Sequence, residues 1–125
     1  MKKKIFISGA TGFIGSHLCE TAVKKGFRVV AFDRYNSNND LGCLKNSNYL
    51  KDIEVILGDV RDYDSVYKSM KGCKTIFHLA ALIGIPYSYV SPLAYVKTNV
   101  EGTSNILEAS KNLNCKNVII TSTSE

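Results

Sequence analysis

The sequence has few of the features that would set it apart from ordinary globular proteins. Among its 125 residues are two prolines, nine glycines and no biased tract, which excludes collagen-like, low-complexity and disordered chains. It has no apolar run long enough to cross a membrane, and its mean hydropathy is −0.04. With 45% hydrophobic and 22% charged residues, it has the composition and length of one domain with its own core.

The four cysteines lack the spacing that metal or redox chemistry needs. Cys19, Cys43, Cys73 and Cys115 form no C-x-x-C pair, and their spacing fits no zinc module. The basic start, residues 1–4, is followed by only three apolar residues before Ser8, whereas a signal peptide has an apolar stretch of about 7–15 residues. We therefore expect free thiols, no metal site and a cytoplasmic protein.

Positive charge is not concentrated in one segment beyond those first residues. The net charge is +5, which is the kind of value that suggests nucleic-acid binding. The lysines and arginines are nevertheless spread along the chain, so we expect neither a nucleic acid nor a membrane as a partner.

Short apolar runs alternate with amphipathic segments along the whole chain. The apolar runs predict strands over residues 4–8, 28–33, 53–57, 75–79 and 117–122. Helices are predicted over residues 13–25, 63–70 and 91–113, with Asp62 and Ser91 as N-caps. A loop is predicted over residues 82–90, and a long loop or an irregular short helix over residues 34–51. The fold class is therefore α/β, a doubly wound parallel sheet in the order 3-2-1-4-5, and a ligand is expected between strands 1 and 4.

A glycine motif, G-x-x-G-x-x-G, follows the first strand and opens the first helix. Gly9 permits a tight turn, Gly12 lets the backbone approach a pyrophosphate, and Gly15 lets the helix pack close to the strand. The N-terminus of the helix then directs free N–H groups and a partial positive charge at the phosphates. The motif, in this context, predicts a dinucleotide site.

Two acids at later strand ends fit the adenosine half of such a ligand. Asp33 lies 18 residues after Gly15, where its carboxylate can accept hydrogen bonds from both ribose hydroxyls and repel a 2′-phosphate, which favours NAD over NADP. Arg34 beside it could accommodate that phosphate, so NADP stays open. Asp59, with the Val60 backbone, is positioned for the adenine edge, and a simple turn acid is almost as good an interpretation of Asp59.

These motifs, with those that follow, resemble the extended short-chain dehydrogenase/reductases, the NAD-dependent epimerases, dehydratases and decarboxylases of nucleotide sugars. The resemblance covers the whole chain and implies the five-stranded Rossmann fold. Besides the glycines and the two acids, the motifs that carry it are His78-Leu79-Ala80-Ala81, Asn99-Val100-x-Gly102-Thr103 and Ser122-Thr123-Ser124-Glu125.

The resemblance assigns further roles residue by residue. It implies that the pyrophosphate is wrapped by Gly9, Thr11, Gly12, Phe13 and Ile14, that the nicotinamide side is lined by Leu79, Ala80 and Ala81, and that Asn99 lies under the cofactor site. It implies a nucleotide-sugar substrate whose 4-hydroxyl is bound by Thr123, with acid/base groups at Ser124 and Glu125. We expect the loop residues Tyr87 and Ser88 to contact that substrate. We expect His78 to be a hydrogen-bonded core residue and His17 to lie on the surface.

The loop 82–89 and Glu125 look most like a 4,6-dehydratase of N-acetylhexosamine nucleotides in the legionaminic-acid pathway, a lyase of carbohydrate biosynthesis. Such an enzyme oxidises C4 of the sugar, removes H5 and loses water from C6, and a carboxylate at Glu125 suits the H5 base. Decarboxylases of glucuronate nucleotides share a similar Thr-Ser-Glu, so a decarboxylase or an epimerase is the alternative.

The family's Tyr-x-x-x-Lys pair and its substrate lobe follow the fifth strand. We therefore expect residues 1–125 to be a C-terminally truncated NAD-binding domain, inactive alone, from an enzyme that forms a homodimer. Tyr67 and Lys71 match the spacing of that pair but lie on a flanking helix, so we expect them to be unrelated to it. A non-catalytic NAD-sensing module is the second alternative.

Overall fold

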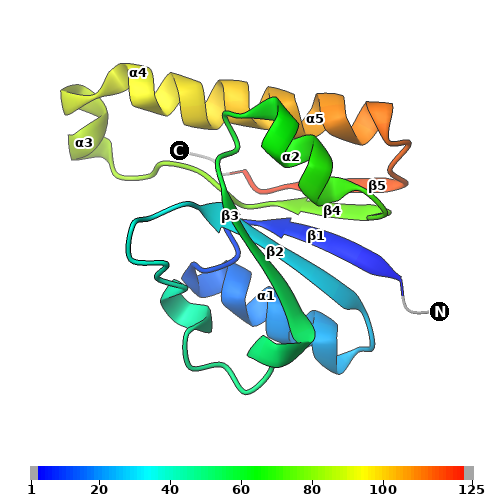
Figure 1. Ribbon diagram of the computed structural model, residues 1–125. Coiled ribbons are helices and arrows are strands. Elements are labelled where there is room, and N and C mark those ends of the chain that lie inside the picture. The colour runs from blue at the N-terminus through cyan, green and yellow to red at the C-terminus, as the bar shows by residue number, and fades with distance from the viewer. Residues whose placement is uncertain (1–2, 123–125) are drawn as a thin grey trace.

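A parallel sheet lies between two layers of helices and turns (Figure 1). The computed structural model describes residues 3–122. The five strands run in the order β3-β2-β1-β4-β5, and every neighbouring pair is parallel, which confirms the predicted fold class and strand order. They are β1 (Lys4–Ser8), β2 (Arg28–Arg34), β3 (Ile53–Gly58), β4 (Thr75–His78) and β5 (Asn117–Ile120).

One face of the sheet packs on α1 (Phe13–Lys24) and on the long segment after β2. That segment, expected as a long loop or an irregular short helix, contains two short 3-10 turns, Gly42–Leu44 and Leu50–Asp52. The opposite face packs on α2 (Tyr63–Met70) and α5 (Gly102–Asn112) (Figure 1).

The strands have apolar side chains on both faces, because each face meets its own helices. In β1, Phe6 belongs to the core under α2 and α5, whereas Ile5 and Ile7 belong to the core under α1. Val30 and Ala31 divide in the same way in β2. This two-sided burial is why the strands are continuous apolar runs in the sequence.

The helix boundaries follow local signals where such signals exist. The Asp62 side chain accepts hydrogen bonds from the N–H groups of Asp64 and Ser65, which confirms it as the N-cap of α2. Helix α1 ends before Gly26, whose φ of +89° suits glycine. Ser91 occupies the N-cap position of α4 and Pro92 the first helical position, as predicted, but the Ser91 side chain makes no capping hydrogen bond.

The expected single helix over residues 91–113 is divided into three. It begins as α4 (Pro92–Tyr95), widens into a π-helical stretch (Val96–Glu101), and continues as α5. A further short helix, α3 (Ile85–Val90), lies in the expected loop after β4. Strands β4 and β5 end one and two residues earlier than expected.

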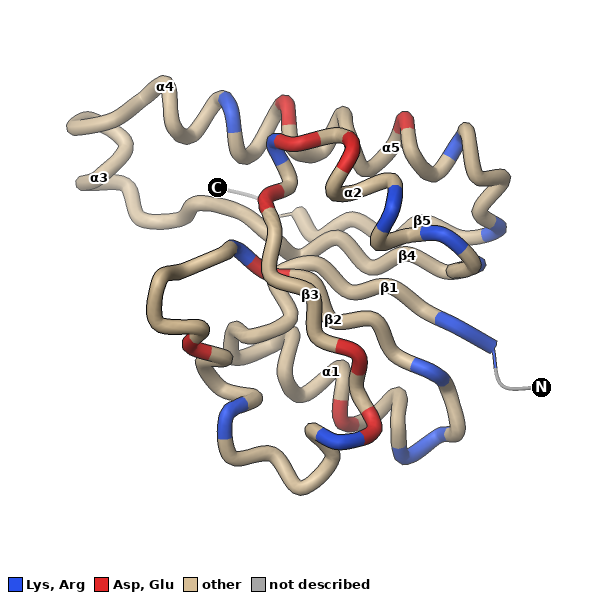
Figure 2. Tube along the Cα trace, in the orientation of Figure 1, with Lys and Arg blue, Asp and Glu red and all other residues tan. Residues whose placement is uncertain are grey.

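The cysteines are free thiols, as expected. Burial raises the pKa of Cys19 to about 12 and that of Cys73 to about 11, so both stay protonated at neutral pH. Lysines and arginines are interspersed with acidic residues along the trace rather than gathered on one element (Figure 2). Within residues 3–122, no helix combines the length and the apolar character needed to span a bilayer.

Candidate functional site

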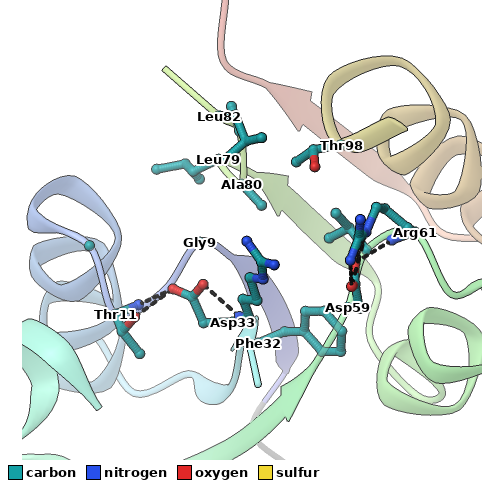
Figure 3. A pocket seen from close by; sticks show the side chains of 14 residues that line it. Gly9, Thr11, Phe32, Asp33, Asp59, Arg61, Leu79, Ala80, Leu82 and Thr98 are labelled. Carbon is teal, nitrogen blue, oxygen red and sulfur yellow. Dashed lines mark hydrogen bonds and ion pairs between the residues drawn. The ribbon is translucent and has the colours of Figure 1, made fainter. Parts of the chain in front are cut away.

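Two cavities meet at the carboxyl edge of the sheet, where the strand order reverses between β1 and β4. The first has a volume of about 320 Å³ (Figure 3). It brings together ten of the residues predicted to bind a cofactor: Gly9, Thr11, Gly12, Asp33, Arg34, Asp59, Val60, Leu79, Ala80 and Ala81. Sequence reasoning missed four further lining residues, Phe32, Arg61, Leu82 and Thr98.

The second cavity, of about 680 Å³, shares the glycine turn and the segment after β4 with the first. It is mostly apolar and adds the remaining predicted cofactor residues, Phe13, Ile14, Gly15 and Asn99. The two predicted substrate residues line neither cavity: Tyr87 and Ser88 lie on α3, where the Tyr87 side chain is 53% exposed. Thr123, Ser124 and Glu125 lie outside the described residues.

The glycine turn is as tight as the motif predicts. Gly9 has a φ of +69°, and a Cβ there would lie 2.8 Å from the backbone nitrogen of Ala80. A Cβ on Gly15 would collide with the carbonyl oxygen of Gly9. The first close approach joins β1 to the segment after β4, and the second joins α1 to β1, so both glycines shape the floor of the site.

Asp33 is held by the glycine turn. Its Oδ2 accepts hydrogen bonds from the Thr11 N–H (2.9 Å) and the Thr11 hydroxyl (2.6 Å), which Figure 3 shows as dashed lines. Its Oδ1 accepts from the Arg34 N–H at 2.7 Å. The Thr11 donors therefore face Asp33 here, and contact between Thr11 and a pyrophosphate stays a prediction.

Asp59 is paired with Arg61, a residue that sequence reasoning missed. The guanidinium Nη2 of Arg61 lies 2.6 Å from Asp59 Oδ2, and Nε lies 3.0 Å from both carboxylate oxygens (Figure 3). The Arg61 N–H also donates to Oδ1, which makes Asp59 a turn residue as well. These hydrogen bonds lower the pKa of Asp59 and raise that of Arg61.

His78 is a buried, hydrogen-bonded residue, as expected. Its Nδ1 lies 2.7 Å from the Ser8 hydroxyl, and its Nε2 lies 3.0 Å from the Thr103 hydroxyl. Ser8 Oγ already accepts the N–H groups of Leu79 and Ala80, so its own proton goes to Nδ1. His78 therefore carries its proton on Nε2, and burial lowers its pKa to about 4.

Two side chains, one from α4 and one from the π-helical stretch, bind the segment after β4. The Asn99 amide donates to the Leu82 carbonyl and accepts from the Leu82 N–H, at 3.0 and 2.9 Å. The Tyr95 hydroxyl lies 2.8 Å from the Ile83 carbonyl and 2.7 Å from that of Gly84. Asn99 thus lies at the site as predicted, and what it does there is to fix the wall that both cavities share.

The remaining predictions concern surface residues. His17 is exposed on α1, where its Nδ1 lies 2.8 Å from the Phe13 carbonyl oxygen. Tyr67 packs partly buried against the core under α2, and the Lys71 ammonium lies 5.4 Å from the centre of its ring. Neither Tyr67 nor Lys71 lines either cavity, so their spacing has no connection with this site.

Comparison with known proteins matches residues 6–125 to the family model for GDP-mannose 4,6 dehydratase. The UDP-N-acetyl-alpha-D-glucosaminuronate decarboxylase of Bacillus cytotoxicus is 34% identical over the whole chain, which corresponds to 38% of that enzyme.

Among solved structures, Pen from Bacillus thuringiensis has a TM-score of 0.88 and 30% identity. The structure of MoeE5 in complex with UDP-glucuronic acid and NAD has a TM-score of 0.79 and 32% identity. The match covers 97% of this chain in both cases, and 38% and 37% of those proteins. The chain therefore spans little more than a third of the length of these relatives.

Proposed function

This chain belongs to the family of NAD-dependent nucleotide-sugar epimerases, dehydratases and decarboxylases, and we propose that it is the NAD-binding part of a 4,6-dehydratase. The proposal depends on one arrangement: all fourteen residues predicted to bind the cofactor line the two adjoining cavities at the switch point between β1 and β4. Fold and cofactor are those of the family, whereas the reaction and the residue roles are our proposal.

The residues present fit a dinucleotide. Gly9 and Gly12 line both cavities without a side chain between them and a ligand, and the first helical turn of α1 has no acidic residue. The cavity with the carboxylates Asp33 and Asp59 takes the adenosine half, and the larger apolar cavity takes the nicotinamide half. NAD bound there would supply a reversible acceptor for the hydride from C4 of the sugar.

The chain's own groups bind and orient the reactants. Asn99 holds the Leu82 backbone that forms the shared wall, and Gly12 leaves the pyrophosphate room at the turn. Thr123 binds the 4-hydroxyl of the sugar, and Glu125 removes H5 once C4 is a ketone, because the ketone acidifies the neighbouring C–H bond. The departing C6 hydroxyl needs a proton, and Ser124 occupies the position at which the resemblance places the second acid/base group, although the best-known dehydratases have Asp there.

The role of Asp33 gives the first test. We expect Asp33→Ala to weaken NAD binding by about 1–3 kcal/mol, the cost of unmade charge-assisted hydrogen bonds, measured by calorimetry. Asp64→Ala is the matched control, since it removes the same charge from an exposed position on α2 that lines neither cavity. Equal NAD affinity in Asp33→Ala and in the unaltered chain would remove Asp33 from the site.

The reaction itself is tested in the longer enzyme that carries these residues. If Glu125 is the H5 base, Glu125→Gln should still oxidise C4 and accumulate NADH, while the loss of water and the solvent exchange at C5 stop. Single-turnover absorbance of NADH and deuterium exchange on a nucleotide N-acetylhexosamine measure both steps. Normal C5 exchange and dehydration in the variant would contradict this role.

A decarboxylase is the second candidate, favoured by the 34% identity to the glucosaminuronate decarboxylase. A decarboxylase loses CO₂ from the C6 carboxylate of a uronic-acid nucleotide after C4 oxidation, and it needs no base at H5. Release of CO₂ from such a substrate, together with no turnover of the N-acetylhexosamine nucleotide, would decide for it.

A further inference from the structure

Both hydrogen-bond donors of Thr11, and its carbonyl oxygen, are engaged within the chain. Its N–H and its hydroxyl both donate to Oδ2 of Asp33, and its carbonyl oxygen accepts the Cys43 N–H at 2.8 Å. The side chain is part of the wall of the smaller cavity, yet its polar atoms point to the protein. Its place in the glycine motif suggests a phosphate contact, whereas the observed bonds connect it with the ribose position.

The Asp33 carboxylate therefore has little hydrogen-bonding capacity left for a ligand. An ionised carboxylate has about four lone-pair positions. Thr11 takes two of them on Oδ2, and the Arg34 N–H takes one on Oδ1. One position on Oδ1 remains for a ligand, which is enough for one ribose hydroxyl but not for two. Turning the carboxylate away would break both bonds to Thr11.

The segment after β2 holds Thr11 from the other side. Gly42 has a φ of +52°, and a Cβ on it would lie 2.6 Å from the Thr11 carbonyl oxygen. Its N–H donates to Asp40 Oδ1 at 2.9 Å, which fixes the turn that brings the Cys43 N–H onto Thr11. The Thr11 backbone is therefore held between this turn and Asp33, so a carboxylate that rotated away would lose its bond to the Thr11 N–H.

We propose that Thr11 is a positioning residue that fixes Asp33 and thereby sets the preference of this site for a free 2′-hydroxyl over a 2′-phosphate; this rests on the proposed role of Asp33. A carboxylate held in place accepts a hydroxyl and repels a phosphate. Arg34, exposed and next in the chain, supplies the positive charge that a 2′-phosphate needs once the carboxylate is free to turn away.

The test compares Thr11→Val with Thr11→Ser. Valine keeps the branched shape and the backbone N–H but lacks the hydroxyl, whereas serine keeps the hydroxyl. Dissociation constants for NAD and for NADP are measured by calorimetry on the whole chain. The preference for NAD over NADP should fall about tenfold in Thr11→Val, as expected for the loss of one charge-assisted hydrogen bond, and stay within about twofold of the original in Thr11→Ser.

Two results would overturn the role of Thr11. One is an unchanged NAD/NADP ratio in Thr11→Val while Asp33→Asn lowers that ratio, which leaves the role of Asp33 intact. The other is an equal loss of both affinities in Thr11→Val, which marks a purely structural residue. An unchanged ratio in Asp33→Asn would instead refute the proposed role of Asp33 itself. If circular dichroism shows that Thr11→Val does not fold, Thr11→Ala is judged by the same ratio.

Discussion

A single buried histidine joins three elements beneath the candidate site. His78 accepts a hydrogen bond from the Ser8 hydroxyl on β1 and donates one to Thr103 on α5, whose hydroxyl donates to the Asn99 carbonyl at 2.6 Å. The direction of every bond is set by the two N–H groups that Ser8 already accepts. A second proton on His78 would face the Ser8 hydroxyl and would break this chain of bonds.

The neutrality of His78 predicts a pH dependence of stability. Its pKa is about 4 in the folded state against an ordinary value of 6.5, so between these values only the unfolded state takes up the proton. Above pH 6.5 the residue contributes nothing to this dependence. As the pH falls from 6.5 to 4, His78 should lower the free energy of unfolding by up to about 3 kcal/mol, and the loss should level off below pH 4.

The comparison of two glutamine variants isolates this effect from the titration of carboxylates. In urea unfolding between pH 7 and pH 4, His78→Gln should lose less stability than the unaltered chain. His17→Gln, which removes the exposed histidine, should keep the original slope. Equal slopes in all three proteins would show that His78 takes up a proton as readily in the folded state as in the unfolded state.

For single residues, the sequence predicts a place at the site where that place depends on the distance to a strand end. The glycine positions and Asp33 follow from their distance to strand ends, and they line the cavities as predicted. The place of Thr98 at the cavity and the pairing of Thr11 with Asp33 arise only when the folded chain brings distant segments together. The Thr11–Asp33 pair is separated by 22 residues, and nothing in the composition or periodicity shows it.

The π-helical stretch is the element that sequence periodicity could not predict. A π-turn needs one more residue per hydrogen-bonded turn than an α-helix, and its cost must be offset by tertiary contacts. Here it carries Thr98 to the first cavity and Asn99 to the second. The apolar pattern of residues 91–113 is that of a continuous helix, so the widening is visible only in the structure.

The strand ends differ from prediction for a similar reason. Leu79 was expected to end the fourth strand, but the N–H groups of Leu79 and Ala80 bond to the Ser8 side chain. The chain therefore leaves the sheet one residue early, at the point where Gly9 approaches Ala80. The strands and their order depend on apolar runs and were predictable, whereas the end of β4 depends on the Ser8 side chain from β1.

The start of α5 packs directly on the wall of the first cavity and gives a prediction. A Cβ on Gly102 would lie 2.7 Å from Cγ2 of Val60. Gly102→Ala should therefore destabilise the fold by about 1–2 kcal/mol, even though alanine favours a helix by up to about 1 kcal/mol. The measurement is the urea unfolding midpoint.

A double variant shows whether the clash is the cause. Val60→Ala removes the methyl group that obstructs the new Cβ, so Gly102→Ala in that background should cost little or nothing. Gly15→Ala is the contrast, since its Cβ would meet the backbone of Gly9 and Ala10, which no truncation relieves. Simple additivity of Gly102→Ala and Val60→Ala would contradict the packing explanation.

For the whole molecule, the site lies where its two halves meet. Strands β1, β2 and β3 with α1 carry the glycine turn and the two carboxylates. Strand β4, the π-helical stretch and α5 carry the wall of the larger, apolar cavity. Gly9, Gly12 and the segment from Leu79 to Leu82 are common to both cavities. A dinucleotide that fills both cavities would therefore contact the two halves of the sheet at once.

Hydrogen exchange with two ligands tests this arrangement. NAD should slow amide exchange at Arg34 and Arg61, which line only the smaller cavity, and at Ile83 and Thr121, which line only the larger one. ADP-ribose lacks the nicotinamide ring, so it should protect the arginines but leave Ile83 and Thr121 nearly unchanged. With each ligand at 100 times its dissociation constant, both stabilise the fold by the same amount, about 2.7 kcal/mol. Any difference in protection is then local, and equal protection of Ile83 by both ligands would place the nicotinamide outside the larger cavity.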